Sequence, residues 1–136
     1  MIMETKFNFN SQVCTDVNQS RRLLELGLKR ETADMWYPHF APSFPIPLTE
    51  DDYVHELNDD GDVPAWSLHR LIEMMPFRVG KYNHLGVIVN KEDIEIIDLE
   101  EGTVDLAWEK ENVYDNIQDC IEWLIKEGYF NKEYLV

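Results

Sequence analysis

The order of hydrophobic and polar positions predicts helices in three stretches of the 136-residue chain. Residues 64–75 and 113–127 repeat apolar side chains at intervals of three and four, which is the spacing of one helix face, and in residues 15–26 the apolar side is supplied by Val17, Leu23 and Leu24. In the last stretch this apolar stripe consists of Val113, Ile117, Cys120, Ile121 and Leu124. We therefore expect two helices before the strands and one packing helix near the C-terminus.

Start and stop residues give these helices their expected limits. Asp16 and Gln19 have the spacing of a capping box at the start of the first helix. Pro64 suits the first turn of the second helix, with Asp62 as its candidate cap. Gly128 is a natural end for the third helix, and the apolar residues after it are expected to fold back onto the domain.

Strands are expected where the hydrophobic period shortens to two. Residues 82–89, 94–99 and 104–108 alternate in this way and are separated by short polar turns, which favours an antiparallel meander of three strands. In the third of these strands Val104, Leu106 and Trp108 are expected to face inward. Residues 7–14 show a weaker alternation that is typical of a short strand or an extended arm. The prediction is one α+β domain over residues 1–136.

Residues 36–48, here called the aromatic–proline segment, fit neither period. Their prolines disfavour a helix interior and a central strand, yet the segment is too apolar for a solvated linker. We expect it to pack on its own domain, on a partner or on a ligand. Large rigid rings often anchor interfaces. The candidate interface residues are therefore Trp36, Tyr37, Phe40 and Phe44.

Charge is distributed unevenly. The formal net charge is −15, and two stretches hold most of the acids: residues 50–62 contain seven acids and no base, and residues 92–122 contain twelve acids and one base. The simplest interpretation is a solvated acidic surface, and the alternative is an acidic face that docks a basic partner. The candidate residues of that face are Asp51, Asp52, Asp59, Asp60, Glu100 and Glu101. The net charge argues against direct binding to nucleic acid or to an anionic membrane.

No motif for a known chemistry is present in the sequence. The histidines lack zinc-ligand spacing, and the acidic run at 58–62 fails as a calcium loop because Ser67 stands where a bidentate Glu is required. Cys14 and Cys120 are the only cysteines; a disulfide between them is open, and a helix dipole is one way to lower the pKa of the Cys14 thiol. We expect no metal, no cofactor, no membrane span and a cytoplasmic location.

Three segments, 23–35, 63–76 and 121–129, resemble small uncharacterised proteins found in prophage-like and other mobile-element regions of gut anaerobic bacteria. The resemblance implies a bacterial cytoplasm and a phage-related or accessory gene. It implies no activity and no functional residues.

Three functions follow as expectations. The leading one is a non-enzymatic protein that acts through an interface with another protein, possible partners including a second copy of the chain. The alternative is an acidic mimic of DNA that inhibits a basic host nuclease or regulator. The third is a small enzyme of an unrecognised kind, which would require a polar cleft.

Overall fold

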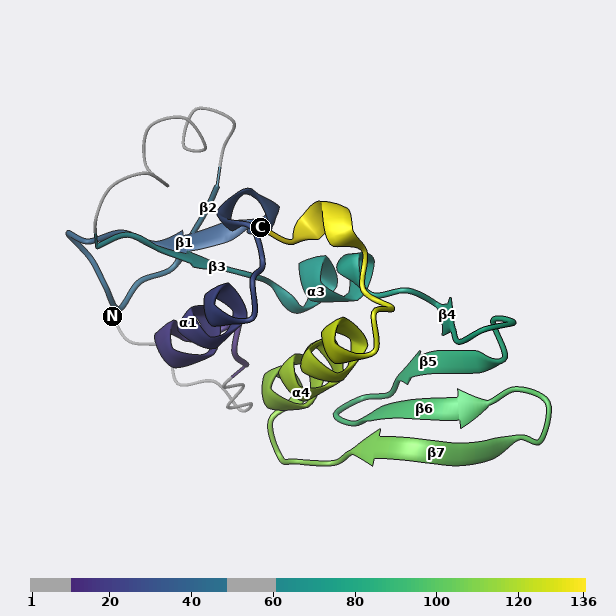
Figure 1. Ribbon diagram of the computed structural model, residues 1–136. Coiled ribbons are helices and arrows are strands. Elements are labelled where there is room, and N and C mark those ends of the chain that lie inside the picture. The colour runs from purple at the N-terminus through teal and green to yellow at the C-terminus, as the bar shows by residue number, and fades with distance from the viewer. Residues whose placement is uncertain (1–10, 49–60) are drawn as a thin grey trace, which may run out of the picture.

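The computed structural model describes residues 11–48 and 61–136. Figure 1 shows its elements in chain order: α1 (Val17–Glu25), η1 (Arg30–Thr32), β1 (Met35–Tyr37), β2 (Ile46–Pro47), β3 (Val63–Ala65), α3 (Leu68–Met74), β4 (Arg78–Val79), β5 (Leu85–Val89), β6 (Ile94–Asp98), β7 (Thr103–Trp108), α4 (Val113–Lys126) and η2 (Lys132–Tyr134). Within the described residues the fold is α+β, as expected, with three α-helices and two antiparallel sheets.

The first helix confirms the capping prediction. The Asp16 carboxylate accepts a hydrogen bond from the Gln19 N–H, and the Gln19 side chain accepts one from the Asp16 N–H, so each satisfies a backbone donor of the first turn. Gly27 follows the end of α1 with a φ of +105°, a conformation that glycine adopts without strain. Of the two alternatives for residues 7–14, a short strand or an extended arm, the strand is wrong for residues 11–14, and residues 7–10 lie outside the described part.

A three-stranded sheet in the order β2-β1-β3 was not predicted. It contains the start of the aromatic–proline segment, because β1 is the central strand, with Trp36 paired to Ile46 on one side and to Pro64 on the other. The two prolines of this sheet, Pro47 and Pro64, both lie in its outer strands, where a missing N–H costs no central hydrogen bond. The expectation that no central strand forms in 36–48 is therefore wrong for Trp36 and Tyr37.

The second helix is shorter than its pattern suggested. α3 begins after Ser67, whose side chain accepts a hydrogen bond from the Arg70 N–H, and not at Pro64, which belongs to β3. Asp62 is accordingly not its cap. A strand pairing with β1, which is distant in sequence, replaces the first turn that the local pattern favoured.

The meander is confirmed and extended. The four-stranded sheet has the order β4-β5-β6-β7, so the three expected strands gain β4 as an additional edge. The β6–β7 register shifts between Ile96 and Ile97, which marks a β-bulge. The expected inward orientation of the third strand is correct for Leu106, which pairs with the buried Ile96 but is 39% exposed because β7 is an edge strand. It is wrong for Val104, because the bulge places this residue beside Ile97 on the opposite face of the sheet.

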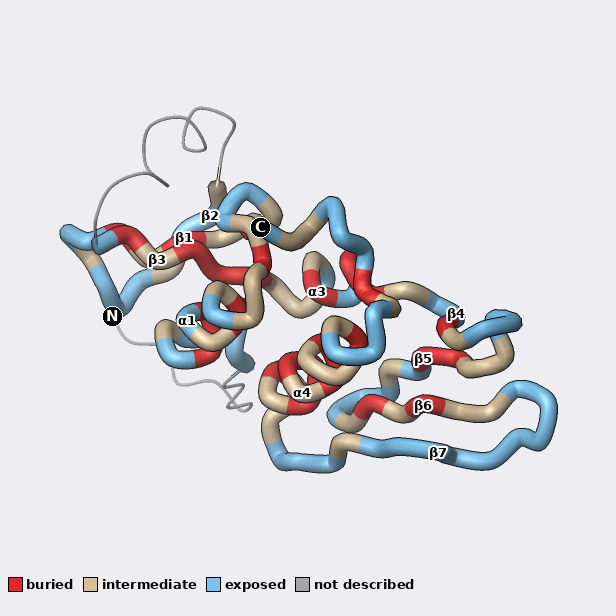
Figure 2. The backbone as a smooth tube through the Cα atoms, viewed as in Figure 1, coloured by how far each residue is buried: buried red, intermediate tan, exposed pale blue. Residues whose placement is uncertain are grey.

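One hydrophobic core joins the helices to one face of the four-stranded sheet. Figure 2 shows the buried positions gathered along α4 and the central strands, and the expected α4 stripe from Ile117 to Leu124 lies within this core. The C-terminal tail folds back as expected: Phe130 is buried, and the Val136 N–H donates to the Gly27 carbonyl at 2.8 Å. Among the described residues no helix is both long and apolar enough to cross a membrane.

Candidate functional site

The four rings predicted as an interface are divided between core and surface. Trp36 is only 2% exposed, and the Tyr37 hydroxyl donates a hydrogen bond to the Thr15 carbonyl at 3.0 Å. Phe40 and Phe44 are instead 70% and 71% exposed. Trp36 is buried on one face of the central strand β1, whereas Tyr37 lies on the other face and is half-buried, with its hydroxyl in contact with Cys14 and Thr15. The exposed pair lies on the connection between β1 and β2, residues 38–45, which we call the exposed loop.

Short-range contacts hold the exposed loop in one conformation. Two successive turns fold it, with the Ala41 N–H donating to the Pro38 carbonyl at 3.0 Å and the Phe44 N–H donating to the Ala41 carbonyl at 3.1 Å. The Phe40 ring packs edge-on against Trp36, at 6.3 Å between ring centroids. Prolines at three of its eight positions further restrict the backbone. Phe40 and Phe44 are therefore presented on a largely preformed loop.

A buried carboxylate anchors the start of the loop. The Asp62 side chain is fully buried, and its Oδ1 accepts a hydrogen bond from the His39 N–H at 2.8 Å and lies 2.9 Å from His39 Nδ1. Arg30 donates to the Asp62 carbonyl at 2.8 Å, which ties the same point to η1. Because burying a carboxylate is costly without partners, these contacts fix the position of His39 at the base of the exposed loop.

The acidic residues are described only in part. Asp51, Asp52, Asp59 and Asp60 lie outside the described residues. Glu100 and Glu101 are exposed on the β6–β7 turn, where their N–H groups donate to Asp98 Oδ1. Within the described part of the chain, none of the nine carboxylates of residues 92–111 is within ion-pair distance of a cation. These nine carboxylates are close together in the sequence, so segment 92–111 carries a large negative charge that no ion pair within the described residues neutralises.

The two cysteines are free and buried, which excludes the disulfide between them. Burial raises the pKa of the Cys14 thiol; a contact with the Tyr37 hydroxyl lowers this pKa, but the negative charges of Asp34 and Asp16 raise it further. The pKa of the Cys14 thiol is therefore raised overall, and not lowered as a helix dipole acting alone would make it. Burial raises the pKa of Cys120 to about 12. Neither thiol has the lowered pKa of a nucleophile.

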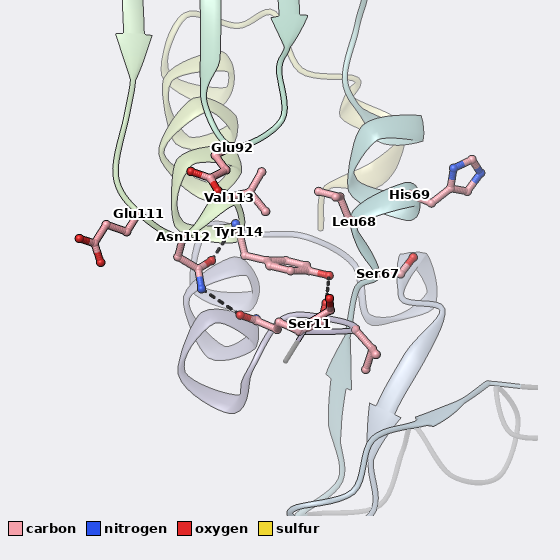
Figure 3. A pocket seen from close by; sticks show the side chains of 11 residues that line it. Ser11, Ser67, Leu68, His69, Glu92, Glu111, Asn112, Val113 and Tyr114 are labelled. Atoms are coloured by element: carbon pink, nitrogen blue, oxygen red, sulfur yellow. Dashed lines mark hydrogen bonds between the residues drawn. The ribbon is translucent and has the colours of Figure 1, made fainter. Parts of the chain in front are cut away.

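A polar hollow of about 620 Å³ opens between the start of α3 and the start of α4 (Figure 3). Its lining includes Ser67, His69 and Tyr114. The Ser67 hydroxyl donates to Asp34, and the Tyr114 hydroxyl donates to the Gln12 carbonyl at 3.2 Å, so both groups are held by structural hydrogen bonds. Figure 3 shows the His69 ring directed away from Tyr114. The hollow thus contains polar groups but no hydrogen-bonded pair of nucleophile and base among them.

The described residues contain no cluster of three or more His, Cys, Asp or Glu side chains that could hold a metal ion.

Comparison with known proteins identifies no relative: no protein-family model, no curated protein and no solved structure matches the chain. Two features of the described protein surface remain as candidate binding sites: the exposed rings of loop 38–45 and the acidic segment 92–111.

Proposed function

We propose that the protein acts without catalysis by binding another protein, and that Phe40 and Phe44 are the anchors of that interface. The observation on which this rests is the 70% and 71% exposure of two large rings on one short loop whose conformation is fixed by turns and prolines. Full burial of a phenylalanine side chain is favourable by roughly 1.5–3 kcal/mol. Because both rings are mostly exposed in the domain, most of this free energy is gained only when a partner covers them.

Preorganisation supports an interface at this loop. Binding to a flexible segment costs about 0.5–1.5 kcal/mol for each side chain that becomes ordered. The edge contact of Phe40 with Trp36, together with the buried Asp62 at the base of the loop, reduces that cost before a partner arrives. The accessory role in a mobile element that the resemblance implies remains part of this proposal.

The test is to replace both rings by serine and to compare the proteins captured from a lysate of the source organism. Phe40→Ser/Phe44→Ser is expected to lose at least one specific partner that the unmodified chain retains. Phe77→Ser is the matched control, since Phe77 is 88% exposed but precedes β4, away from the loop. Identical partners for the unmodified chain and the double variant, or equal losses with the control, would contradict the proposal.

A second candidate function is the acidic inhibitor, and a specific observation favours it. The nine carboxylates of residues 92–111 lack cation partners in the described part of the chain, so a basic groove gains their full attraction. This function predicts capture of a basic nucleic-acid-binding protein at low salt, its release at high salt, and competition by duplex DNA. A partner whose capture depends on Phe40 and Phe44 but not on salt would instead support the aromatic interface.

A further inference from the structure

One face of the four-stranded sheet remains open. Ile94 and Ile96 of β6 point into the core and are fully buried, so the alternate residues Glu95 and Ile97 lie on the opposite face, where the Glu95 carboxylate accepts a hydrogen bond from Asn90 Nδ2 at 2.7 Å. There Ile88, Leu99 and Val104 are 36%, 43% and 54% exposed. We call this the open sheet face.

Strand register places a single row of residues across that face. Arg78 of β4 pairs with Gly86 of β5, Gly86 pairs with Ile97 of β6, and Ile97 pairs with Val104 of β7. Leu99 lies over the glycine, since a Cβ added to Gly86 would be 3.0 Å from Leu99 Cδ2. The row therefore runs from Arg78 at the β4 edge, across Gly86 and Ile97, to Val104 beside the bulge of β7 at the other edge.

The two edges of the open sheet face have opposite charge. The β4 edge has Arg78 and Lys81, and the Lys81 Nζ lies 5.4 Å from the centre of the Tyr82 ring. The β7 edge has the exposed Asp105 in its bulge and Glu101 in the β6–β7 turn. Within the described residues none of these four charged groups is in an ion pair.

The β4–β5 and β6–β7 turns lie at the same end of the sheet. The Leu99 N–H donates to the His84 carbonyl at 2.8 Å, which joins the two turns, and Figure 1 shows both turns at the end away from α4. Lys81 and Glu101 are therefore at the same end of the open sheet face but on opposite edges. This arrangement makes the face complementary to a copy of itself.

We propose that the open sheet face binds a second copy of the chain in a two-fold symmetric dimer. A two-fold axis parallel to the strands stacks the two faces with β4 of one copy over β7 of the other. Arg78 then lies opposite the β7 edge of the other copy, which holds Asp105, and Lys81 lies opposite the β6–β7 turn of the other copy, which holds Glu101. Both contacts occur twice in each dimer. An axis across the strands would instead set like charges against each other, so the charges select the first arrangement. A uniformly basic partner would meet Arg78 and Lys81 unfavourably.

The area of the face predicts a weak dimer. Three strands roughly 17 Å long and the two-residue β4, spaced about 4.8 Å apart, give a flat area of about 280 Å² for each copy. A standard interface buries about 800 Å² for each partner, so we expect a weak, reversible dimer. Such a dimer presents two exposed loops, but its formation does not depend on Phe40 or Phe44.

Charge reversal on either edge provides the test. Purified unmodified protein is expected to rise from monomer mass towards twice that mass in sedimentation experiments over about 5–500 μM. Arg78→Glu/Lys81→Glu and Glu101→Lys/Asp105→Lys are each expected to weaken self-association at least about tenfold. An equimolar mixture of the two variants is expected to form heterodimers, because each reversed edge then meets an edge of opposite charge.

The mixture separates a lost interface from a damaged fold, since an unfolded variant cannot restore association. Glu25→Lys/Glu133→Lys is the matched control: it reverses two exposed charges on α1 and η2, away from the sheet, and is expected to leave dimerisation unchanged. A monomer at every concentration, or two variants whose mixture stays monomeric, overturns the proposed dimer. Neither result bears on partner capture through the exposed loop, which is measured with different variants.

Discussion

Replacement of Asn116 is expected to destabilise the fold more than any other single polar change on α4. Its side chain is fully buried and makes three hydrogen bonds to the backbone. Nδ2 donates to the Glu92 carbonyl at 2.7 Å and to the Lys110 carbonyl at 2.8 Å, while Oδ1 accepts from the Lys110 N–H at 2.8 Å. The Asn116 amide thus connects both the β5–β6 turn and the β7–α4 connection to the helix by hydrogen bonds.

The expected loss follows from the number of groups left without partners. A typical hydrogen bond contributes about 0.5–1.5 kcal/mol net, so three of them contribute about 3 kcal/mol in Asn116→Leu. Leucine has the same number and branching of side-chain heavy atoms as asparagine but bulkier methyl groups, so this variant removes the hydrogen bonds without leaving a cavity. With a urea slope of about 1–3 kcal/mol per molar, the unfolding midpoint is expected to fall by roughly 1–3 M.

Equilibrium unfolding in urea, followed by circular dichroism and tryptophan fluorescence, measures the change. Asn90→Leu is the control, because Asn90 is exposed and its side chain bonds only to the Asp93 and Glu95 carboxylates in its own hairpin. That variant is expected to change the free energy of unfolding by less than about 0.5 kcal/mol. A loss below about 1 kcal/mol for Asn116→Leu, with an unchanged urea slope, would refute this reasoning.

Two further predictions concern titratable groups. Burial raises the pKa of Asp119, but hydrogen bonds from Lys110 and Arg22 outweigh that effect and hold the pKa below its ordinary value. The resulting stability is complete above the unfolded pKa of about 3.9 and is lost as pH falls through the folded value, so the stability difference between the unmodified chain and Asp119→Asn is expected to narrow below about pH 4. Because burial raises the pKa of both Cys14 and Cys120, neither thiol is expected to react quickly with a chromogenic disulfide until urea unfolds the chain; rapid labelling of the native protein would contradict this.

Local signals in the sequence predicted the elements whose hydrogen bonds close within a few residues. The Asp16–Gln19 capping box is confirmed atom by atom, because donor and acceptor are only three positions apart. The stripe of α4 and the β5–β6–β7 meander are confirmed for the same reason: period and short turns specify them. Their existence required no knowledge of the rest of the chain.

Local sequence patterns did not predict the strand pairings between distant segments. Pro64 looks like the first turn of a helix, but Val63–Ala65 pairs with β1 almost thirty residues earlier. The prolines of 36–48 argued against a central strand, yet Trp36 and Tyr37 form one, because the prolines of this sheet lie in the outer strands. The favourable free energy of burying Trp36 and of hydrogen-bonding its backbone outweighs the low strand propensity of this proline-rich segment.

The candidate sites show the same division. The sequence by itself identified Phe40 and Phe44 among four aromatic candidates, and it located the acidic stretch that contains Glu100 and Glu101. Only the tertiary structure separated the two exposed rings from the buried Trp36, because exposure depends on which face of a strand meets the core.

Composition and period thus determined the class of fold, the start of α1, the stripe of α4 and the acidic character of this protein. The tertiary structure decided which sheet face is covered, which thiols are buried and which charges lie on opposite edges of the open sheet face. The physical reason is that periodicity and capping act over a few residues, whereas burial and strand register are properties of segments brought together only when the whole domain folds.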